Sequence, residues 1–409
     1  MSSRTATAAL ATTPDAPRVW QYIMAGFAAS LVSIGLARFA YAPLVPPLIE
    51  AHWFSSSNVV FLGAANLAGY LVGALIGHPL SRRFSSVHAL RFMMVAVTAA
   101  FVACAWPLSV SWFFAWRLIS GISGGAIMVL VAATVLPHVP RERRGIAGGA
   151  IFLGIGVGIA GSGTLVPVLL ESGLRATWLG LAALSAVLTA LTWFAWPEHH
   201  ARRGATQAPQ HKVAMDANIA LLFGQYGLMA VALVPAMVFL VDFVARGIGA
   251  GAHAGARFWV IYGVGAIMGP PLYGWLADRL GARAGLRIVL LVQSVAVATL
   301  WLAGNQTWLA LATLFVGTFP PGIVPLVLAR IHELIPHDEH AQNQAWSRAT
   351  ISFATSQAVA GYAYSAIFAL TGGHHRVLFG IAVAGLALAL LAELASLAGI
   401  ARGARDEQA

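Results

Sequence analysis

The chain has 409 residues, of which 59% are hydrophobic and only 9% are charged, and its mean hydropathy is +0.79. These values exclude a soluble globular protein, in which about a quarter of the residues are charged. The formal net charge of +10 would by itself suit a nucleic-acid-binding protein, but the positions of the basic residues indicate a different origin for the charge.

Apolar segments long enough to cross a membrane recur along the whole chain. A helix of about 20 apolar residues spans the hydrocarbon core of a bilayer, which is roughly 30 Å thick. We expect twelve such spans, all helical, because each is much longer than the roughly ten alternating residues of a barrel strand. They lie near residues 20–45, 57–79, 88–107, 111–137, 146–170, 174–196, 217–243, 256–277, 285–303, 306–331, 345–370 and 376–400.

The basic residues are distributed unevenly between the two sides of this predicted topology. With the N-terminus in the cytoplasm, the inner loops and tails hold Arg4, Arg18, Arg82, Arg83, Arg91, Arg141, Arg143, Arg144, Arg202, Arg203, Lys212, Arg279, Arg283, Arg287, Arg330, Arg402 and Arg405. The outer loops hold only Arg175, Arg246, Arg257 and Arg376. This asymmetry follows the positive-inside rule. It predicts a multi-pass protein of the inner membrane with both termini in the cytoplasm. Since the basic residues are explained by topology, the net charge no longer indicates a nucleic-acid-binding protein.

The N-terminal residues, the cysteine and the histidines do not indicate a signal peptide, a disulfide or a metal site. Residues 1–17 have no short apolar region or cleavage site of a signal peptide, so we expect a cytoplasmic tail and a retained first helix. Cys104 is the only cysteine, which excludes an internal disulfide and a cysteine-rich metal site. The 337-HDEH-340 cluster is interpreted as a solvated turn. We therefore predict no metal and no cofactor.

The longest polar interruption, residues 198–215, divides the chain into a first lobe over 18–197 and a second lobe over 216–400, followed by a cytoplasmic tail over 401–409. The loops after the second and eighth spans, 77-GHPLSRRF-84 and 274-GWLADRLG-281, are similar to each other. So are the loops after the fourth and tenth spans. Both pairs are about 197 residues apart, which indicates a duplicated six-helix unit. Paired repeats around a central loop are typical of secondary transporters.

Three motifs resemble a known family. The stretch 274-GWLADRLGAR-283 resembles the loop signature of the major facilitator superfamily, and 117-RLISGISGG-125 resembles its fourth-helix motif. The segment 38-RFAYAPLVP-46 is similar to the first-helix motif of the YbfB/YjiJ-like branch, for which no substrate is settled. The resemblance covers essentially the whole chain. It implies an all-α membrane fold of twelve helices in two pseudo-symmetric six-helix lobes.

The resemblance also implies gating residues. Asp278 and Arg279 would form an inner gate, with Arg82 in the matching loop of the first lobe, where Ser81 replaces the usual acid. The simpler alternative is that these arginines only set the topology. In the tenth span, Pro320 and Pro321 predict a kinked gating helix, with simple packing as the alternative. The fifth span lacks the Gly-Pro pair that typifies proton-driven drug exporters of the superfamily.

Arg38 is the least expected residue of the first span, because an arginine at the centre of a bilayer costs about 2.5–3.5 kcal/mol. It lies in the predicted outer half of the span, with Tyr41 on the same helix face. Arg38 either meets a substrate or takes part in coupling in a wet cavity, or it reaches the outer headgroups or pairs structurally with a helix end. Pro43, Pro46 and Pro47 follow, and they either break a cavity-lining helix or end it.

Arg117 in the fourth span is a second arginine near the predicted outer surface. The family resemblance implies that it takes part in proton or substrate coupling, and the alternative is a structural arginine that binds backbone carbonyls. Asn66 in the second span either contacts substrate or packs between helices. The middle of spans one, two, four and five contains no acid that could neutralise these two arginines. Because a guanidinium group suits a carboxylate, phosphate or sulfonate, the pattern favours an organic anion as substrate.

The second lobe contributes Gln225, Tyr226 and Asp242 in the seventh span as candidate substrate or coupling residues. Asp242 would pair with one of the two arginines, carry a coupling proton, or form a surface pair with Arg246 four residues later. Glu393 in the last span is expected to face lipid or to reach inward toward Arg402 and Arg405.

These observations predict a secondary transporter that moves a small organic solute by rocker-switch alternating access. The favoured substrate class is an organic anion. The protein is not expected to be an enzyme. Its partners would be a small-molecule substrate and the lipid bilayer, and it would act as a monomer. Proton coupling, symport or antiport, and the direction of transport stay open. The alternatives are an exporter of drugs or other hydrophobic compounds, and a non-transporting membrane receptor or scaffold.

Overall fold

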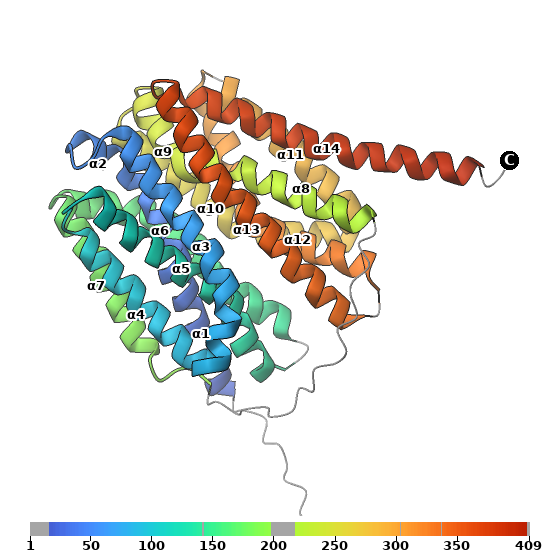
Figure 1. Cartoon of the computed structure of the whole chain (residues 1–409), viewed down its shortest axis with the longest axis horizontal. Helices are drawn as coiled ribbons and strands as arrows, with labels where there is room; N and C mark the ends of the chain where they lie inside the picture. The colour runs from blue at the N-terminus through green and yellow to red at the C-terminus, as the bar shows by residue number, and fades with distance from the viewer. Residues whose placement is uncertain (1–15, 141–142, 198–216, 303, 337, 407–409) are drawn as a thin grey trace, which may run out of the picture.

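The computed structural model describes residues 16–140, 143–197, 217–302, 304–336 and 338–406, and in these residues every regular element is a helix (Figure 1). The long helices are α1 (Ala16–Ser30), α3 (Ser56–Phe84), α4 (Ser86–Cys104), α5 (Val110–Val135), α6 (Arg144–Leu170), α7 (Leu174–Thr192), α8 (Ala217–Val234), α10 (Ala252–Leu280), α11 (Ala282–Leu302), α12 (Gln306–Leu334), α13 (Glu339–Leu370) and α14 (His375–Asp406). The short helical pieces are η1 (Leu31–Leu36), η2 (Phe39–Leu44), α2 (Val45–Glu50), η3 (Leu136–His138), η5 (Pro235–Phe239), α9 (Leu240–Asp242) and η6 (Phe243–Gly247).

The predicted all-α membrane fold is confirmed. Eleven helical segments of the described chain are long and apolar enough to cross a bilayer. The twelfth predicted span is α13, which has 32 residues but is less apolar than its neighbours. Its polar side chains Gln357 and Ser365 are buried, and the helix packs against α3 and α8. Because neighbouring helices cover these groups, α13 does not need a uniformly apolar surface.

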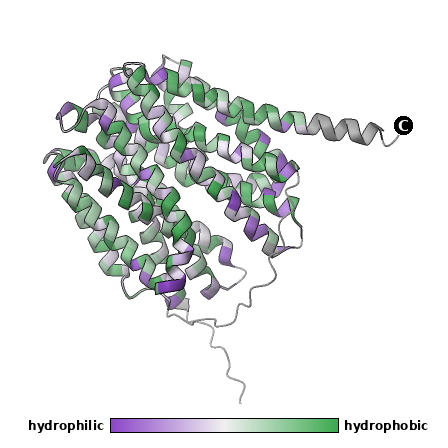
Figure 2. Cartoon of the chain, in the orientation of Figure 1, coloured by the Kyte–Doolittle hydropathy of each residue, from purple (hydrophilic) through white to green (hydrophobic). Residues whose placement is uncertain are grey.

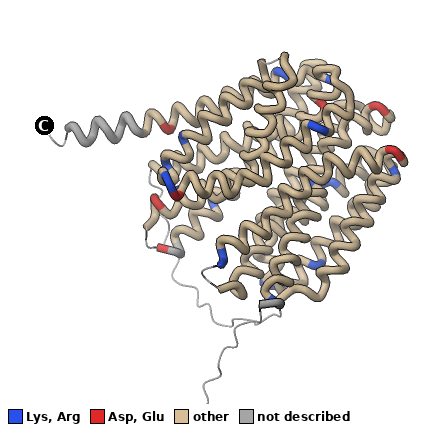
Figure 3. The backbone as a smooth tube through the Cα atoms, turned by 180° about the vertical axis from the view of Figure 1, so that it is seen from behind, with Lys and Arg blue, Asp and Glu red and all other residues tan. Residues whose placement is uncertain are grey.

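The helices form two groups (Figure 1). In the first lobe α3 packs on α5, α4 on α7 and α1 on α6, and in the second lobe α10 packs on α12, α11 on α14 and α8 on α14. The seam between the lobes consists mainly of α6 against α10 and α3 against α13. Apolar residues cover the helices, while most acidic residues lie near the ends of the helix bundle (Figures 2 and 3). This is the surface expected of a bundle surrounded by lipid.

Glycines show that the two lobes are built as repeats. In the first lobe, a Cβ atom on Gly69 or Gly73 would lie about 2 Å from the carbonyl oxygens of α5. In the second lobe, a Cβ on Gly265 or Gly269 would lie equally close to the carbonyl oxygens of α12. Small residues at these positions allow the helix backbones to touch. The equivalent glycines are 196 residues apart in the sequence, in agreement with the offset of the repeated loops.

We expect Gly269→Ala to lower the thermal stability of the purified protein in detergent, by about 1–3 kcal/mol of unfolding free energy. The added methyl group would lie 2.1 Å from the carbonyl oxygen of Thr318, so α10 and α12 must separate. Gly274 lies on the same helix, and a methyl group added there would have no atom within 4 Å, which makes Gly274→Ala the matched control. Equal melting temperatures for the two variants would contradict this account of the packing.

The first span does not stop at its prolines. The chain runs from α1 through the π-helix η1 and the 3-10 helix η2 into α2, so Pro43, Pro46 and Pro47 all lie within helical turns. The prediction that these prolines end the helix is therefore wrong, and the alternative of a broken helix is supported. Arg38 lies at the junction of η1 and η2, where the hydrogen-bonding pattern changes. Such irregular turns are frequent at functional sites.

The seventh span repeats this irregularity. After α8 it continues as the π-helix η5, the single turn α9 and the π-helix η6. The first helix of each lobe is thus discontinuous, and η2 contacts η5 and α9. The two broken helices meet at the predicted outer end of the bundle, so the lobes touch there through backbone that departs from the regular α-helix.

The last helix ends later than predicted. Helix α14 continues to Asp406, because no proline or glycine-rich turn ends it at residue 400, where the tail was predicted to begin. Helix α12 runs without interruption through Pro320 and Pro321, and its role as a gating helix stays a prediction. The tail up to residue 15 and the whole loop over 198–215 lie outside the described residues.

Candidate functional site

Arg38 connects the two lobes. Its Nη2 group donates a hydrogen bond to Oε1 of Gln357 on α13, which is 319 residues away in the sequence. The guanidinium carbon lies 5.0 Å from the ring centre of Tyr70 and 5.6 Å from that of Phe39, so two aromatic rings attract the charge. The side chain is partly exposed, and its Nε group has no hydrogen-bond partner among the described residues.

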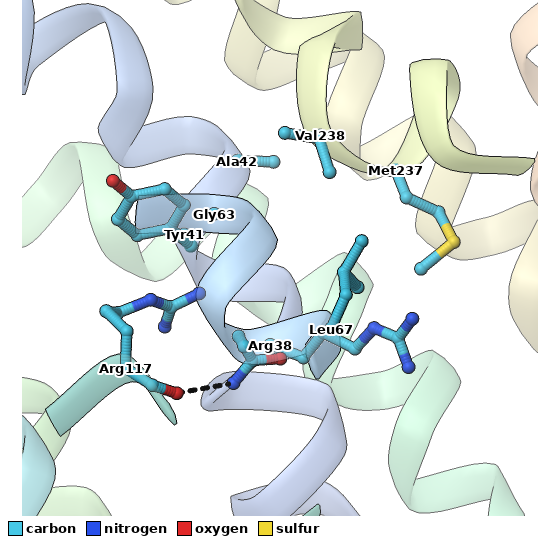
Figure 4. Close-up of a pocket in the computed structure, with 9 residues that line it drawn as sticks. Arg38, Tyr41, Ala42, Gly63, Leu67, Arg117, Met237 and Val238 are labelled. Carbon is cyan, nitrogen blue, oxygen red and sulfur yellow. Dashed lines mark hydrogen bonds between the residues drawn. The ribbon is translucent and has the colours of Figure 1, made fainter. Parts of the chain in front are cut away.

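Arg117 has different surroundings. Only 3% of the residue is exposed. Its Nη1 group donates to the backbone carbonyl oxygen of Ala37 at 2.6 Å, and its guanidinium carbon lies 4.1 Å from the ring centre of Tyr41. Figure 4 shows that the Arg117 guanidinium points toward Tyr41, whereas that of Arg38 points away from both residues toward the side of Met237. The two guanidinium groups therefore point in different directions.

Asn66 and Tyr41 hold the backbone around Arg117. The Asn66 amide donates to Oγ of Ser120 at 2.9 Å and to the carbonyl oxygen of Arg117 at 3.5 Å, the latter drawn as a dashed line in Figure 4. The Tyr41 hydroxyl donates to the carbonyl oxygen of Val59 at 2.7 Å. These bonds satisfy groups that would otherwise be unpaired in an apolar environment. They give both residues a structural task in this conformation.

The space between the two arginines is small. Its volume is about 10 Å³, and it is lined by Arg38, Tyr41, Ala42, Gly63, Asn66, Leu67, Arg117, Met237 and Val238 (Figure 4). This volume suits one water molecule. An organic substrate that contacts Arg38 must therefore approach from the other side of its guanidinium group, or the lobes must separate at this point.

Asp242 does not pair with Arg38 or Arg117. Its carboxylate is fully buried, forms an ion pair with Arg246 and lies within hydrogen-bond distance of His375. Arg246 donates to both carboxylate oxygens, with a distance of 2.7 Å from Nη2 to Oδ2, and Nε2 of His375 lies 2.6 Å from Oδ2. The expected i,i+4 pair with Arg246 is present, but it is buried rather than on the surface. Sequence reasoning missed His375, which comes from the start of α14.

Gln225 and Glu393 form a second buried group at the other end of the second lobe. Gln225 donates to Oε2 of Glu393 at 3.2 Å, while Arg283 and Arg287 donate to Oε1 at 2.8 and 3.3 Å. Only 2% of Glu393 is exposed. The expectation that Glu393 faces lipid is therefore wrong, because Arg283 and Arg287 of α11 bind its carboxylate inside the bundle. The side chains of Arg402 and Arg405 lie outside the described part of the chain. Gln225 is occupied by this network.

Aromatic residues line the seam beside Arg38. Tyr226 packs on Phe353 with ring centres 4.6 Å apart. Tyr262 stacks on Trp259 at 4.9 Å, and Nε1 of Trp259 donates across the seam to Oγ of Ser162. The Tyr262 hydroxyl is buried without a hydrogen-bond partner among the described residues. Tyr262 was not predicted from the sequence, because an aromatic residue in a long apolar helix carries no signal of its own.

The predicted inner gate makes no ion pair in this conformation. Arg82, Asp278 and Arg279 are exposed at the ends of α3 and α10. Arg279 packs over the ring of Trp275 at 5.9 Å, and no ion pair joins Asp278 to another described residue. The role of the three residues as a gate stays a prediction that concerns another conformation of the lobes.

Comparisons with known proteins agree with this architecture. The chain is 25% identical over 382 residues to the inner membrane transport protein YdhP of Escherichia coli, covering 90% of this chain and 95% of that one. It is 24% identical over 342 residues to a gallate transporter of Pseudomonas putida, covering 69% and 74%. A match to mpsC of Macrophomina phaseolina, an MFS-type protein, is 28% identical over 142 residues and covers 34% of this chain and only 27% of that protein.

The fold also matches a solved structure, the xylose transporter XylE of E. coli in a partially occluded inward-open conformation, with a TM-score of 0.73 and 17% identity, covering 92% of this chain and 97% of that chain. At this identity the match speaks for the fold alone. The family described as "Uncharacterised MFS-type transporter YbfB" matches residues 30–394. The chain therefore belongs to this family of transporters within the major facilitator superfamily, as the first-helix and loop motifs predicted.

Proposed function

We propose that the protein is a secondary transporter of a small organic anion and that Arg38 binds the anionic group. The observation that carries the proposal is the bond between Arg38 and Gln357. It crosses the seam between the lobes, and it pairs a charged donor with a neutral acceptor. In the described chain no carboxylate pairs with Arg38, so an anionic ligand is the partner that its charge lacks.

Physical chemistry favours this exchange of partners. The amide oxygen of Gln357 is neutral, whereas a carboxylate adds the attraction of opposite charges, and arginine–carboxylate pairs often form two parallel hydrogen bonds. A carboxylate can use two guanidinium nitrogens at once, and the unpaired Nε group of Arg38 leaves one free for a bidentate contact. A ligand carboxylate would therefore displace Oε1 of Gln357 from Arg38.

The surroundings of Arg38 suit a planar, aromatic anion. Tyr70 and Phe39 flank the guanidinium group, and Tyr226 and Tyr262 lie buried at the same seam, the latter with an unused hydroxyl. Aromatic rings provide a large apolar contact and a polar end group. The similarity to a gallate transporter adds to this reasoning, because gallate is an aromatic carboxylate. We therefore name aromatic carboxylates as the substrate class.

Displacement of Gln357 would also link binding to the movement of the lobes. The lobes, residues 18–197 and 216–400, would pivot about the seam as a monomer with both termini in the cytoplasm. The Arg38–Gln357 bond stabilises one arrangement of α13 against the first lobe. A ligand that competes for Arg38 binds better to an arrangement without this bond, and a difference in affinity of this kind is what shifts a conformational equilibrium.

The test is uptake of radiolabelled benzoate and gallate into proteoliposomes, with counterflow against the unlabelled compound. We expect saturable uptake of aromatic carboxylates and none of the matching amines. Repeating the assay with an imposed proton gradient decides whether a proton is coupled. Uptake of lipophilic cations in place of carboxylates would support the exporter alternative, and tight binding of benzoate without flux would support a receptor.

The exporter alternative has lost its best candidate residue. Export of cationic compounds needs an acid that faces the substrate, and Asp242 was the only acid suited to this role. Its carboxylate is fully buried and is paired with Arg246 and His375. A cation would have to displace both partners, whereas an anion at Arg38 displaces one neutral amide.

We expect Gln357→Leu to raise the apparent affinity for benzoate about tenfold, because the substrate no longer competes with a hydrogen bond to a charged group, which contributes about 1.5–3 kcal/mol. Equilibrium binding to the purified protein measures the change. Ser365→Ala is the control on the same helix, since this hydroxyl bonds only to its own helix at Gly361. Weaker binding by the Gln357→Leu variant would mean that Gln357 contacts the substrate itself. It would refute the proposal that Gln357 and the substrate compete for Arg38.

A further inference from the structure

A second, larger cavity lies at the opposite end of the second lobe from Glu393, at the predicted outer surface. Its volume is about 520 Å³, within the range of about 300–1,000 Å³ that small-molecule sites occupy. It is lined by Ser56, Phe243, Arg246, Gly247, Phe368, Gly372, Gly373, His374, His375 and Arg376. We call it the outer vestibule. Because Ser56 belongs to α3 and the other residues belong to the second lobe, both lobes contribute to it.

The lining of the outer vestibule is basic. It contains two arginines and two histidines and no acid. Arg246 is neutralised by Asp242 beneath it. Arg376 and His374 are exposed, and among the described residues no carboxylate pairs with either of them. A further acid, Glu50, interacts with Arg246. The charge of Arg376 is therefore the one in the lining that no described carboxylate pairs with.

Two long helices begin at the same cavity and add to its positive potential. Helix α3 starts at Ser56, and α14 starts at His375. The N-terminus of a helix carries a partial positive charge and unpaired N–H groups, which favour anions. Gly372 and Gly373, both with positive φ, form a wall without side chains, so that a ligand can approach the backbone. Arginines, helix ends and an open wall thus converge on one space.

From this geometry we infer that the outer vestibule is a separate binding site for a small soluble oxyanion, such as a carboxylate or a phosphate. It is distinct from the site at Arg38, because the buried Asp242, Phe243 and His375 lie between the vestibule and the interior of the bundle. A charged recess of this kind raises the local concentration of oppositely charged solutes. The inference does not depend on which compound the protein transports.

Ser56 offers a direct probe of the vestibule. In the Ser56→Cys variant, reconstituted in phosphatidylcholine nanodiscs, the new thiol reacts with methanethiosulfonate reagents. The parent protein is the background control, because Cys104 is only 2% exposed. We expect an anionic sulfonate reagent to react about tenfold faster than a cationic one, relative to their rates with a free thiol. The ratio should fall when Arg376→Gln is added, and it should stay unchanged with Arg175→Gln, an exposed outer arginine outside the cavity.

Occupancy is tested with a neutral reagent, whose rate does not respond to charge alone. Benzoate and inorganic phosphate should each slow its reaction with the thiol of the Ser56→Cys variant in a saturable manner, and Arg376→Gln should weaken this protection severalfold. Protection should persist when Arg38→Gln is introduced, because Arg38 does not line the vestibule. A protein that lacks transport but keeps this protection would thus contradict the proposed transport site alone. Equal rates for both charged reagents, no protection, or protection only by added phosphatidylglycerol would overturn the inference.

Discussion

Replacing Arg38 by glutamine is expected to lower the initial rate of benzoate uptake into proteoliposomes about 100-fold. The variant keeps a side chain that can bond to Gln357 but loses the charge that binds the anion. A hydrogen bond to a charged group contributes about 1.5–3 kcal/mol, and each 1.4 kcal/mol corresponds to a factor of about ten. Because the variant lacks both the positive charge and the two parallel N–H donors of the guanidinium group, the effect should reach the upper end of this range.

One further variant separates the contribution of the Arg38 charge from that of its planar shape, and another serves as a control. Arg38→Lys keeps the charge but not the planar fork, so we expect a loss of about tenfold, between the wild type and Arg38→Gln. Arg175→Gln removes an exposed arginine that packs over Trp106 and should leave uptake unchanged. Gel filtration and melting temperature establish that each variant is folded. Wild-type uptake by folded Arg38→Gln would refute the role of Arg38 as the anion anchor.

The sequence was sufficient to predict the fold, because each part of the fold follows from a local rule. Span length, the excess of basic residues in alternate loops and the repeated loop motifs do not depend on how the helices pack. The glycines at equivalent positions of α3 and α10, Gly69 and Gly265, carry the same repeat into the structure. Helix α13 was also predicted as a span, although it is less apolar than α14, because its length and its place in the repeat do not depend on its polar side chains.

The candidate site was harder to predict, because its partners come from distant parts of the chain. The sequence indicates that Arg38 and Asp242 are unusual, but a pattern in one span cannot name the residue that meets it. Arg38 bonds to Gln357, and Asp242 bonds to His375. Each partner lies more than 100 residues away in the sequence. Without homologous sequences to compare, only the packing of the lobes identifies these pairs.

The two arginines illustrate the same limit. Both lie near the predicted outer ends of their spans, and depth alone suggests a common cavity. They instead meet different partners: Arg117 on α5 reaches the carbonyl oxygen of Ala37 and the ring of Tyr41, while Arg38, between η1 and η2, reaches the second lobe. An irregular helix changes the direction of a side chain by an amount that helical periodicity does not predict. Arg38 is therefore the better candidate for substrate.

The second large effect is expected at Asp242. We expect Asp242→Asn to destabilise the purified protein by about 3–5 kcal/mol, the usual cost of removing one partner of a buried ion pair. Asparagine has nearly the same shape, but it leaves the Arg246 charge without a counterion and offers His375 only one acceptor oxygen. Through Asp242 the bonds join α9 and η6 to the start of α14, so their loss should loosen the predicted outer end of the second lobe.

Thermal unfolding in detergent measures this loss, with Asp278→Asn as the matched control, because Asp278 is an exposed acid in the same lobe. Transport separates a structural role from a coupling role. If Asp242 mainly holds η6 and α14 together, uptake driven by a proton gradient and exchange without a gradient should decline in parallel with stability. If a stable Asp242→Asn protein exchanges benzoate at the wild-type rate but no longer responds to the gradient, Asp242 carries the coupled proton, and the structural assignment is wrong.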